Sequence, residues 1–308
     1  NAFFDLEESA KVINISKESI NLINDFISGK SWNEKLVGDL ISGNTNSLSY
    51  FSNASRKTTL VDPTLSDLSK INTDTVLPPL NGWRNISKIS TLKALSLSKK
   101  GLHKEAMEES LKSIRVGQLI MDSTQTVIGH LVGHAIKSQG LDSIDKILVS
   151  SNLNKVDSQK YVTELNKLHD SGNGLKKSYI VEYNVRNNSL DQIARGSMRS
   201  DIDNSDLPSF AKKNINNNYY FRLNETKQLN ANYTREQIKN VDIACSDVNN
   251  ISEPSKIAPK FFIQMYVTEN AAGKIIQDTV NSSLSSIYKK RCEVETHLNS
   301  LIKLLEAN

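Results

Sequence analysis

Two histidines, His130 and His134, form the only histidine pair in this sequence with the spacing of metal ligands. Residues four apart on a helix share one face, as in the zinc-binding H-E-x-x-H pattern. Leu131 stands where that pattern requires a general-base glutamate, and the sequence names no third ligand. We therefore expect packing or surface histidines and assign no metal ligand, with a metal site or an enzyme site near His130 and His134 as the alternative.

The helix that carries the pair has an apolar stripe of its own. Apolar residues recur at helical spacing over residues 128–136, and a helical wheel places both histidines opposite that stripe. Gly129 and Gly133 adjoin the histidines, so a second helix could pack closely there.

Residues 28–31 (Ser-Gly-Lys-Ser) resemble the end of a phosphate-binding loop. That motif needs a glycine where this chain has Asn24, and it follows a strand, whereas the preceding segment here is helical in pattern. We interpret Gly29 as a helix stop and reject a phosphate site.

The remaining chemical candidates are weaker. No G-x-S-x-G elbow occurs, and Asp201, Asp203 and Asp206 are followed by no glutamate at the twelfth position of a calcium loop. The carboxylate pairs at 108–109 and at 293 and 295 lie among lysines and arginines, which indicates solvated helix faces. The catalytic residues are thus unknown, and the sequence indicates no cofactor.

Composition indicates an all-α fold of stacked antiparallel helices. The 308 residues include only 13 glycines and 6 prolines, about half their usual share, and aromatic residues make up 6%. A β-sandwich or barrel needs more turns and more β-forming residues. We expect a single domain over 1–308 with three sub-regions: N-terminal helices and a loop (1–80), a helical core (81–150) and a C-terminal helical region (151–308).

Hydrophobic periodicity and breakers place the elements. We expect two irregular stretches, at 44–80 with room for one short helix and at 197–216, and a break near Asn230. The expected helices cover 4–28, 31–43, 84–100, 103–122, a region around 128–136, 141–149, 157–170, 174–196 and 217–245.

The C-terminal segment predicts a long heptad helix with one charged residue, Arg291, in its seam. It either packs on the first helix of this chain or pairs with another chain. The seam residues are Val280, Leu284, Ile287, Arg291, Val294, Leu298, Leu301 and Leu305.

Charge and hydropathy exclude some classes of partner and leave others open. The net charge of +4 is spread along the chain, whereas a nucleic-acid binder shows a coherent basic stripe, so we expect no nucleic acid. No apolar run is long enough to cross a membrane. The chain begins at Asn1, which is compatible with a removed signal or membrane anchor and equally with a simple boundary. Cys245 and Cys292 are compatible with a disulfide or with two buried thiols.

Residues 92–95, 101–106 and Leu111 resemble one tetratricopeptide-type hairpin, with Gly101 at the turn and a small Ala106 where the helices approach. No second copy occurs 34 residues away. More widely, residues 111–141, 223–226 and 270–274 resemble uncharacterised exported or envelope-anchored bacterial helical proteins. That resemblance implies a fold and a location in the cell envelope, and no activity.

These observations favour a protein-binding or scaffolding helical module of the bacterial envelope, with another protein as its partner. Two alternatives remain: an enzyme whose site is assembled from dispersed residues, and a homo-oligomer formed through the C-terminal helix.

Overall fold

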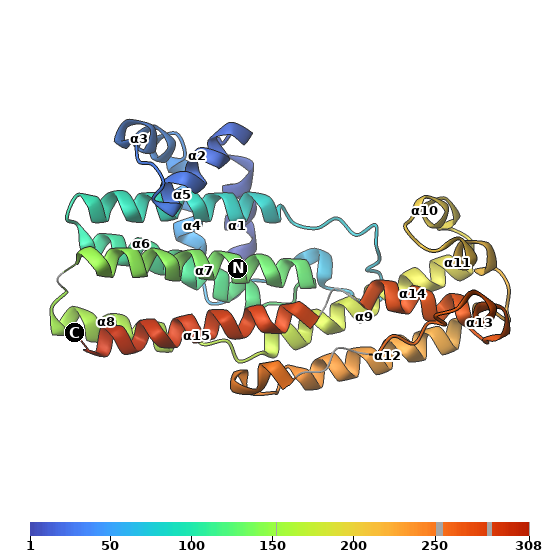
Figure 1. Cartoon of the computed structure of the whole chain (residues 1–308). Coiled ribbons are helices and arrows are strands. Elements are labelled where there is room, and N and C mark those ends of the chain that lie inside the picture. Colours follow the sequence, from blue (N-terminus) through green and yellow to red (C-terminus); the bar gives the residue numbers. More distant parts are fainter. Residues whose placement is uncertain (152, 251–254, 282–284, 308) are drawn as a thin grey trace. The chain divides into compact units, whose positions relative to one another are not determined.

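The computed structural model describes residues 1–151, 153–250, 255–281 and 285–307. Within these residues the chain is all-α, as composition predicts, with 15 α-helices and two short 3-10 helices, η1 (Pro63–Leu65) and η2 (Cys245–Asn250) (Figure 1). The helices are α1 (Ala2–Lys11), α2 (Lys17–Ser28), α3 (Glu34–Ser42), α4 (Thr45–Ala54), α5 (Leu80–Lys99), α6 (His103–Asp122), α7 (Val127–Ser150), α8 (Lys155–Asn166), α9 (Asn173–Ala194), α10 (Arg199–Asn204), α11 (Ser209–Asn214), α12 (Leu223–Asn240), α13 (Phe262–Val267), α14 (Ala271–Asn281) and α15 (Ser285–Ala307).

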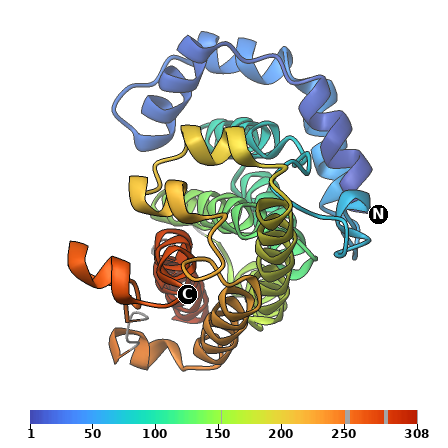
Figure 2. The same ribbon diagram turned by 90° about the vertical axis from the view of Figure 1, so that its right-hand side faces the viewer.

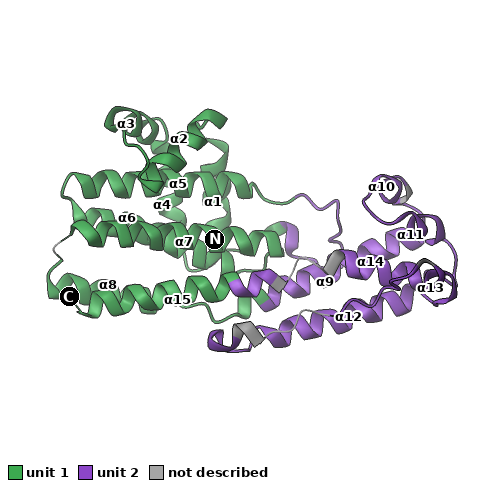
Figure 3. Ribbon diagram, in the orientation of Figure 1, with its two compact units in different colours: residues 1–63, 77–175, 290–308 green, residues 64–76, 176–289 purple. Residues whose placement is uncertain are grey.

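Two compact units divide the chain (Figure 3). Unit 1 comprises residues 1–63, 77–175 and 290–308, and unit 2 comprises residues 64–76 and 176–289. Each unit is built from segments distant in sequence, so the units cross the three sub-regions expected along the chain.

Stacked helices α5, α6 and α7 form the centre of unit 1 (Figure 1). Gly101, with a φ of 78°, makes the turn between α5 and α6, and Ala106 is fully buried where the two helices approach. The expected central hairpin is therefore present. Helix α7 runs without interruption from Val127 to Ser150, so the separate helices expected on either side of Gly140 are one.

Helices α6 and α7 approach each other through glycines. A Cβ on Gly117 would lie 2.5 Å from the backbone nitrogen of Lys137, and one on Gly140 would lie 2.9 Å from the carbonyl of Ser110. Gly133 meets Met121 and Gly117 in the same way, which confirms its predicted part in close packing, whereas a Cβ on Gly129 would meet only the side chain of Gln125, just before the start of its own helix.

The N-terminal helices α1 to α4 lie in an arc against α5 (Figure 2). The one helix expected over 4–28 is two, because the Ser16 hydroxyl accepts from the Ser19 amide and caps a new helix, α2. Asn33 caps α3, so this helix begins at Glu34 and not at residue 31 as expected. The stretch expected to be mostly irregular contains the three-turn helix α4, whose Phe51 is fully buried in the core of this arc.

The C-terminal helix α15 packs within unit 1 on α6, α7 and α8, and not on the first helix as one of the two expectations had it. Leu298, Leu301 and Leu305 are at most 1% exposed and share a core with residues such as Ile144 and Leu165. Of the remaining seam positions, Leu284 lies outside the described residues, as does the side chain of Val280.

Unit 2 is built from α9 to α14, and its core gathers α9, α10, α11 and α14. Residues 197–216, expected as a loop, form the short helices α10 and α11, because Ile202 and Phe210 are buried against α14. Helix α12 continues through Asn230, whose buried amide donates to the carbonyl of Tyr183 and to Asn187 on α9.

Candidate functional site

The histidine face of α7 is buried. His130 is fully buried and His134 is 3% exposed, and in the predicted apolar stripe Ile136 is fully buried whereas Ile128 is 55% exposed. The reason is the glycine-mediated approach of α6, which covers the side of α7 that carries the histidines. The two Nε2 atoms lie 3.1 Å apart, within hydrogen-bonding distance.

A third group, Asp170, joins the pair from the loop between α8 and α9. Its ligand-type oxygen and the histidine nitrogens all lie within 4.8 Å of one another. One carboxylate oxygen accepts from the Gly172 amide at 2.7 Å, and the other accepts from Nε of Arg291 at 2.9 Å. Arg291 also donates through Nη2 to the Asp170 carbonyl at 3.0 Å, so a backbone amide and one guanidinium fix this carboxylate.

Burial controls the electrostatics of this cluster. Desolvation lowers the pKa of His130 to about 4, and desolvation together with His130 lowers the pKa of His134. Burial alone would raise the pKa of Asp170, but the Gly172 amide and Arg291 outweigh it and leave that pKa below its usual value. At neutral pH the cluster is therefore two neutral imidazoles beside a paired carboxylate.

The Nδ1 atoms of His130 and His134 lack hydrogen bonds of ordinary geometry among the described residues. Nδ1 of His134 is buried without a hydrogen-bond partner among the described residues. Nδ1 of His130 makes no hydrogen bond of ordinary geometry there, although the Met121 carbonyl is near enough to favour its protonated form. The Nε2–Nε2 contact is thus the one well-formed hydrogen bond of either ring in this part of the structure.

Lys137, one turn further along the same face, is fully buried and fully paired. Its ammonium donates to Gln118 at 2.9 Å, to the Leu168 carbonyl at 2.6 Å and to Glu295 at 2.7 Å. The second oxygen of Glu295 lies 2.9 Å from Nδ1 of His169. Three donor bonds satisfy an ammonium, so this is a buried ion pair that joins α6, α7 and α15.

Sequence reasoning missed Asp170, Lys137 and Glu295. The solvated face expected for Glu295 is wrong, and so is that expected for Glu109, which is 4% exposed and pairs with Lys112 at 2.7 Å. The one available signal was Arg291, a charge in an apolar seam, which needs a buried partner.

The other sequence candidates have ordinary structural positions. Gly29 ends α2 with a φ of 80°, as predicted. Asp201 and Asp203 lie in helix α10 and form no calcium loop. A second group that could hold a metal ion is Asp142, Asp145 and His297, where Nε2 of His297 lies 2.6 Å from Asp145; the two carboxylate side chains are 55% and 47% exposed.

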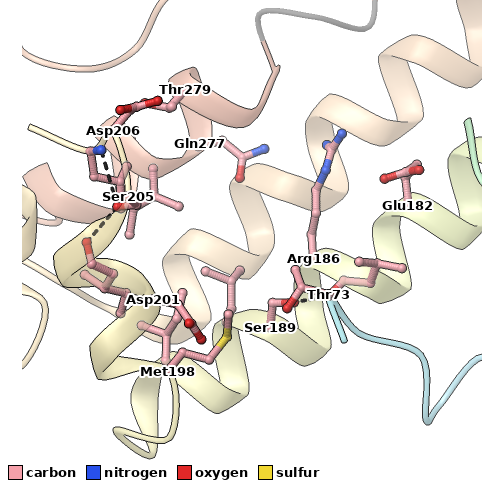
Figure 4. Close-up of a pocket in the computed structure, with 16 residues that line it drawn as sticks. Thr73, Glu182, Arg186, Ser189, Met198, Asp201, Ser205, Asp206, Gln277 and Thr279 are labelled. Atoms are coloured by element: carbon pink, nitrogen blue, oxygen red, sulfur yellow. Dashed lines mark hydrogen bonds between the residues drawn. The ribbon is translucent and has the colours of Figure 1, made fainter. Parts of the chain in front are cut away.

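Unit 2 contains a cavity of about 430 Å³ bordered by α9, α10, the segment before α11 and α14 (Figure 4). Its walls are mainly apolar: Val185, Leu190, Ile193, Met198, Ile202, Leu207 and Ile276. In Figure 4, Arg186 and Glu182 stand at one end of the cavity, and Ser205, Asp206 and Thr279 at the other. The volume falls in the range of small-ligand and side-chain binding pockets, about 300–1,000 Å³.

The polar groups of the cavity wall differ in whether they have hydrogen-bond partners. Burial lowers the pKa of Arg186, whose guanidinium lies over the ring of Tyr233 at 5.6 Å and donates to Asn230. Gln277 is 4% exposed, and its amide nitrogen has no hydrogen-bond partner among the described residues. Leaving such a donor unpaired costs about 1–3 kcal/mol, so a bound acceptor would be favoured.

Two further findings concern the cysteines and the hydropathy of the helices. Cys245 and Cys292 are both disulfide-bonded, which resolves the alternatives left open by sequence. Among the described helices, none combines the length and the apolar character needed to cross a membrane.

Comparison with known protein families, with curated proteins and with solved structures finds no match to this chain.

Proposed function

We propose that this protein is a non-catalytic binding module that acts outside the cytoplasm and takes apolar anchor residues of a partner polypeptide into the cavity of unit 2. The observation that carries the proposal is the combination of apolar walls with the buried, unpaired amide donor of Gln277. A polypeptide supplies both complements, an apolar side chain and a backbone carbonyl.

The charge of the cavity wall indicates which partner segments fit the cavity. Three carboxylates, those of Glu182, Asp201 and Asp206, line the cavity with a single basic residue, Arg186, which interacts with Glu182, so negative charge is in excess. A partner segment with lysine or arginine next to its apolar anchors fits this charge distribution.

The disulfide supports the extracytoplasmic location, because disulfides persist in oxidising compartments and are rare in the cytosol. The resemblance to exported bacterial helical proteins, carried by residues such as 131–136, belongs to the same proposal. The enzyme alternative places substrate chemistry at His130 and His134, and the burial of both rings opposes it.

A photo-crosslinking experiment in the native envelope tests this function. A photoreactive residue at Asp206 should yield one covalent adduct, whose crosslinked peptide carries apolar residues beside lysine or arginine. The same residue at Glu236, exposed on α12, serves as the positional control.

Two substitutions then test whether the adduct depends on the cavity or on exposed apolar residues in general. Leu190→Glu in the cavity wall should abolish the adduct, and Ile263→Glu, at a residue 77% exposed on α13, should leave it intact. Equal adducts from positions 206 and 236, or an adduct that survives Leu190→Glu in a folded protein, would refute the proposal.

A further inference from the structure

We propose that His130, His134 and Asp170 form a binding site for one transition-metal ion of the zinc class in unit 1. The three residues bring two imidazole nitrogens and one carboxylate together from two separate segments, α7 and the loop after α8, and their ligand atoms lie within 4.8 Å of one another. The site is independent of the cavity in unit 2.

The distance between the imidazoles fits shared coordination. Metal–nitrogen bonds of about 2.0–2.1 Å at a tetrahedral angle hold two nitrogens about 3.3 Å apart. The Nε2 atoms of His130 and His134 are 3.1 Å apart, and both rings are neutral, which is the form that binds metal. The separation of the two nitrogens is therefore already close to that of two ligands of one ion.

The carboxylate is held as metal ligands usually are. Each oxygen of Asp170 accepts one hydrogen bond, from Gly172 or from Arg291, and an ionised carboxylate oxygen has capacity for a second partner. Such outer partners orient ligating carboxylates and account for about 10- to 100-fold in metal affinity. Arg291 thus positions Asp170 and does not bind the ion.

Hydrogen bonding within the pair also favours an ion. Two neutral imidazoles that share one Nε2–H···Nε2 bond leave one ring with an unprotonated Nδ1, and Nδ1 of His134 has no described partner. An ion coordinated by both Nε2 atoms would use both lone pairs at once, and each ring would then carry its proton on Nδ1.

The surrounding charge selects the kind of ion. Arg291 and Lys137 both act on His134 as nearby positive charges, so added charge is unfavourable unless the metal–imidazole bonds are strong. Zinc, cobalt, nickel and copper ions form such bonds, whereas Mg²⁺ and Ca²⁺ prefer sites made of oxygen ligands. We therefore expect binding of Zn²⁺ and Co²⁺ and none of Mg²⁺ or Ca²⁺.

Titration of the full chain with Zn²⁺, after removal of metal by a chelator, tests the site by calorimetry. The wild type should bind one ion per chain in unit 1, and His134→Gln should bind it at least about 100-fold more weakly, because the variant loses a ligand. His297→Gln is the matched control in the Asp142–Asp145–His297 cluster, and it should bind as the wild type does.

A second readout uses the unsubstituted protein and so does not depend on variant folding. Zn²⁺ should shift the imidazole NMR resonances of His130 and His134, and Co²⁺ should give the intense visible absorption of a tetrahedral site. Absence of binding by the wild type, full binding by a folded His134→Gln, loss of binding in His297→Gln, or unshifted resonances would each overturn the proposal.

Discussion

Replacement of Gly117 by alanine should destabilise the protein, because the new methyl group has no space between α6 and α7. A Cβ at this position would lie 2.5 Å from the Lys137 backbone nitrogen and 2.7 Å from the Gly133 carbonyl. Both are backbone atoms of the neighbouring helix, so the helices must separate. Overpacking of this kind costs about 1–3 kcal/mol, against a gain in helix propensity of about 1 kcal/mol. We expect a net loss of up to about 2 kcal/mol.

The matched control is Gly38→Ala on α3, where a Cβ meets no atom within 4 Å. The same chemical change at this exposed helical position should raise stability by about 0.5–1 kcal/mol. Urea unfolding followed by far-ultraviolet circular dichroism gives both values from the shift in midpoint. A Gly117→Ala protein stabilised as much as Gly38→Ala would refute the close approach of α6 and α7, and with it the reason given for burial of the histidine face.

Three further predictions concern buried charge and the disulfide. Lys137→Ala should cost about 3–5 kcal/mol in unfolding free energy, because it leaves Glu295 buried with one partner fewer; an unchanged urea midpoint would contradict this. The pKa of Glu109 is lowered in the folded state, since Lys112 and Lys93 outweigh burial, so its stabilisation is present above the unfolded-state pKa of about 4.3 and is lost as pH falls. Glu109→Gln should therefore be less stable than the wild type at pH 7, and the difference should shrink below about pH 4 in pH-dependent urea unfolding. Thiol counting in denaturant should find no free thiol without reductant and two with it, and Cys245→Ser should lower stability by about 2–4 kcal/mol; reactive thiols in the unreduced protein would contradict the disulfide.

Local signals predicted most of the fold. The turn at Gly101 and the helices on either side of it follow from glycine and from apolar spacing, and α6 occupies the residues expected for it. The predicted helix bounds were wrong where a single capping side chain determines where a helix begins. Ser16 divides the N-terminal helix because its hydroxyl accepts from the Ser19 amide, and sequence spacing alone does not distinguish this serine from its many neighbours.

The candidate metal site was only half predictable. Helical spacing brings His130 and His134 together, but Asp170 reaches them through the path of the loop between α8 and α9, which is a tertiary property. The sequence left open whether the histidines pack or face solvent, and their burial follows from the close approach of α6 and α7 at the glycines. Glycine contributes nothing to a hydrophobic pattern, but at a helix contact it determines how closely the two helices pack.

The cavity of unit 2 had no sequence signal, because its walls come from α9, α10 and α14. Residues 197–216 are polar enough to predict a loop, yet Ile202 is 5% exposed and helps to enclose the cavity. Gln277 is an ordinary helix residue in sequence, and only the fold shows that its amide nitrogen is buried, with no partner among the described residues.

The most direct test of the binding function is a calorimetric titration of the full chain with a synthetic peptide that spans the segment crosslinked from position 206. We expect one peptide per chain, at least about 10-fold weaker binding by Gln277→Leu, and unchanged binding by Ile263→Glu. A 10-fold loss corresponds to about 1.4 kcal/mol, the scale of one buried hydrogen bond. Equal affinity of Gln277→Leu and Leu190→Glu to the wild type would contradict the claim that this cavity takes the partner.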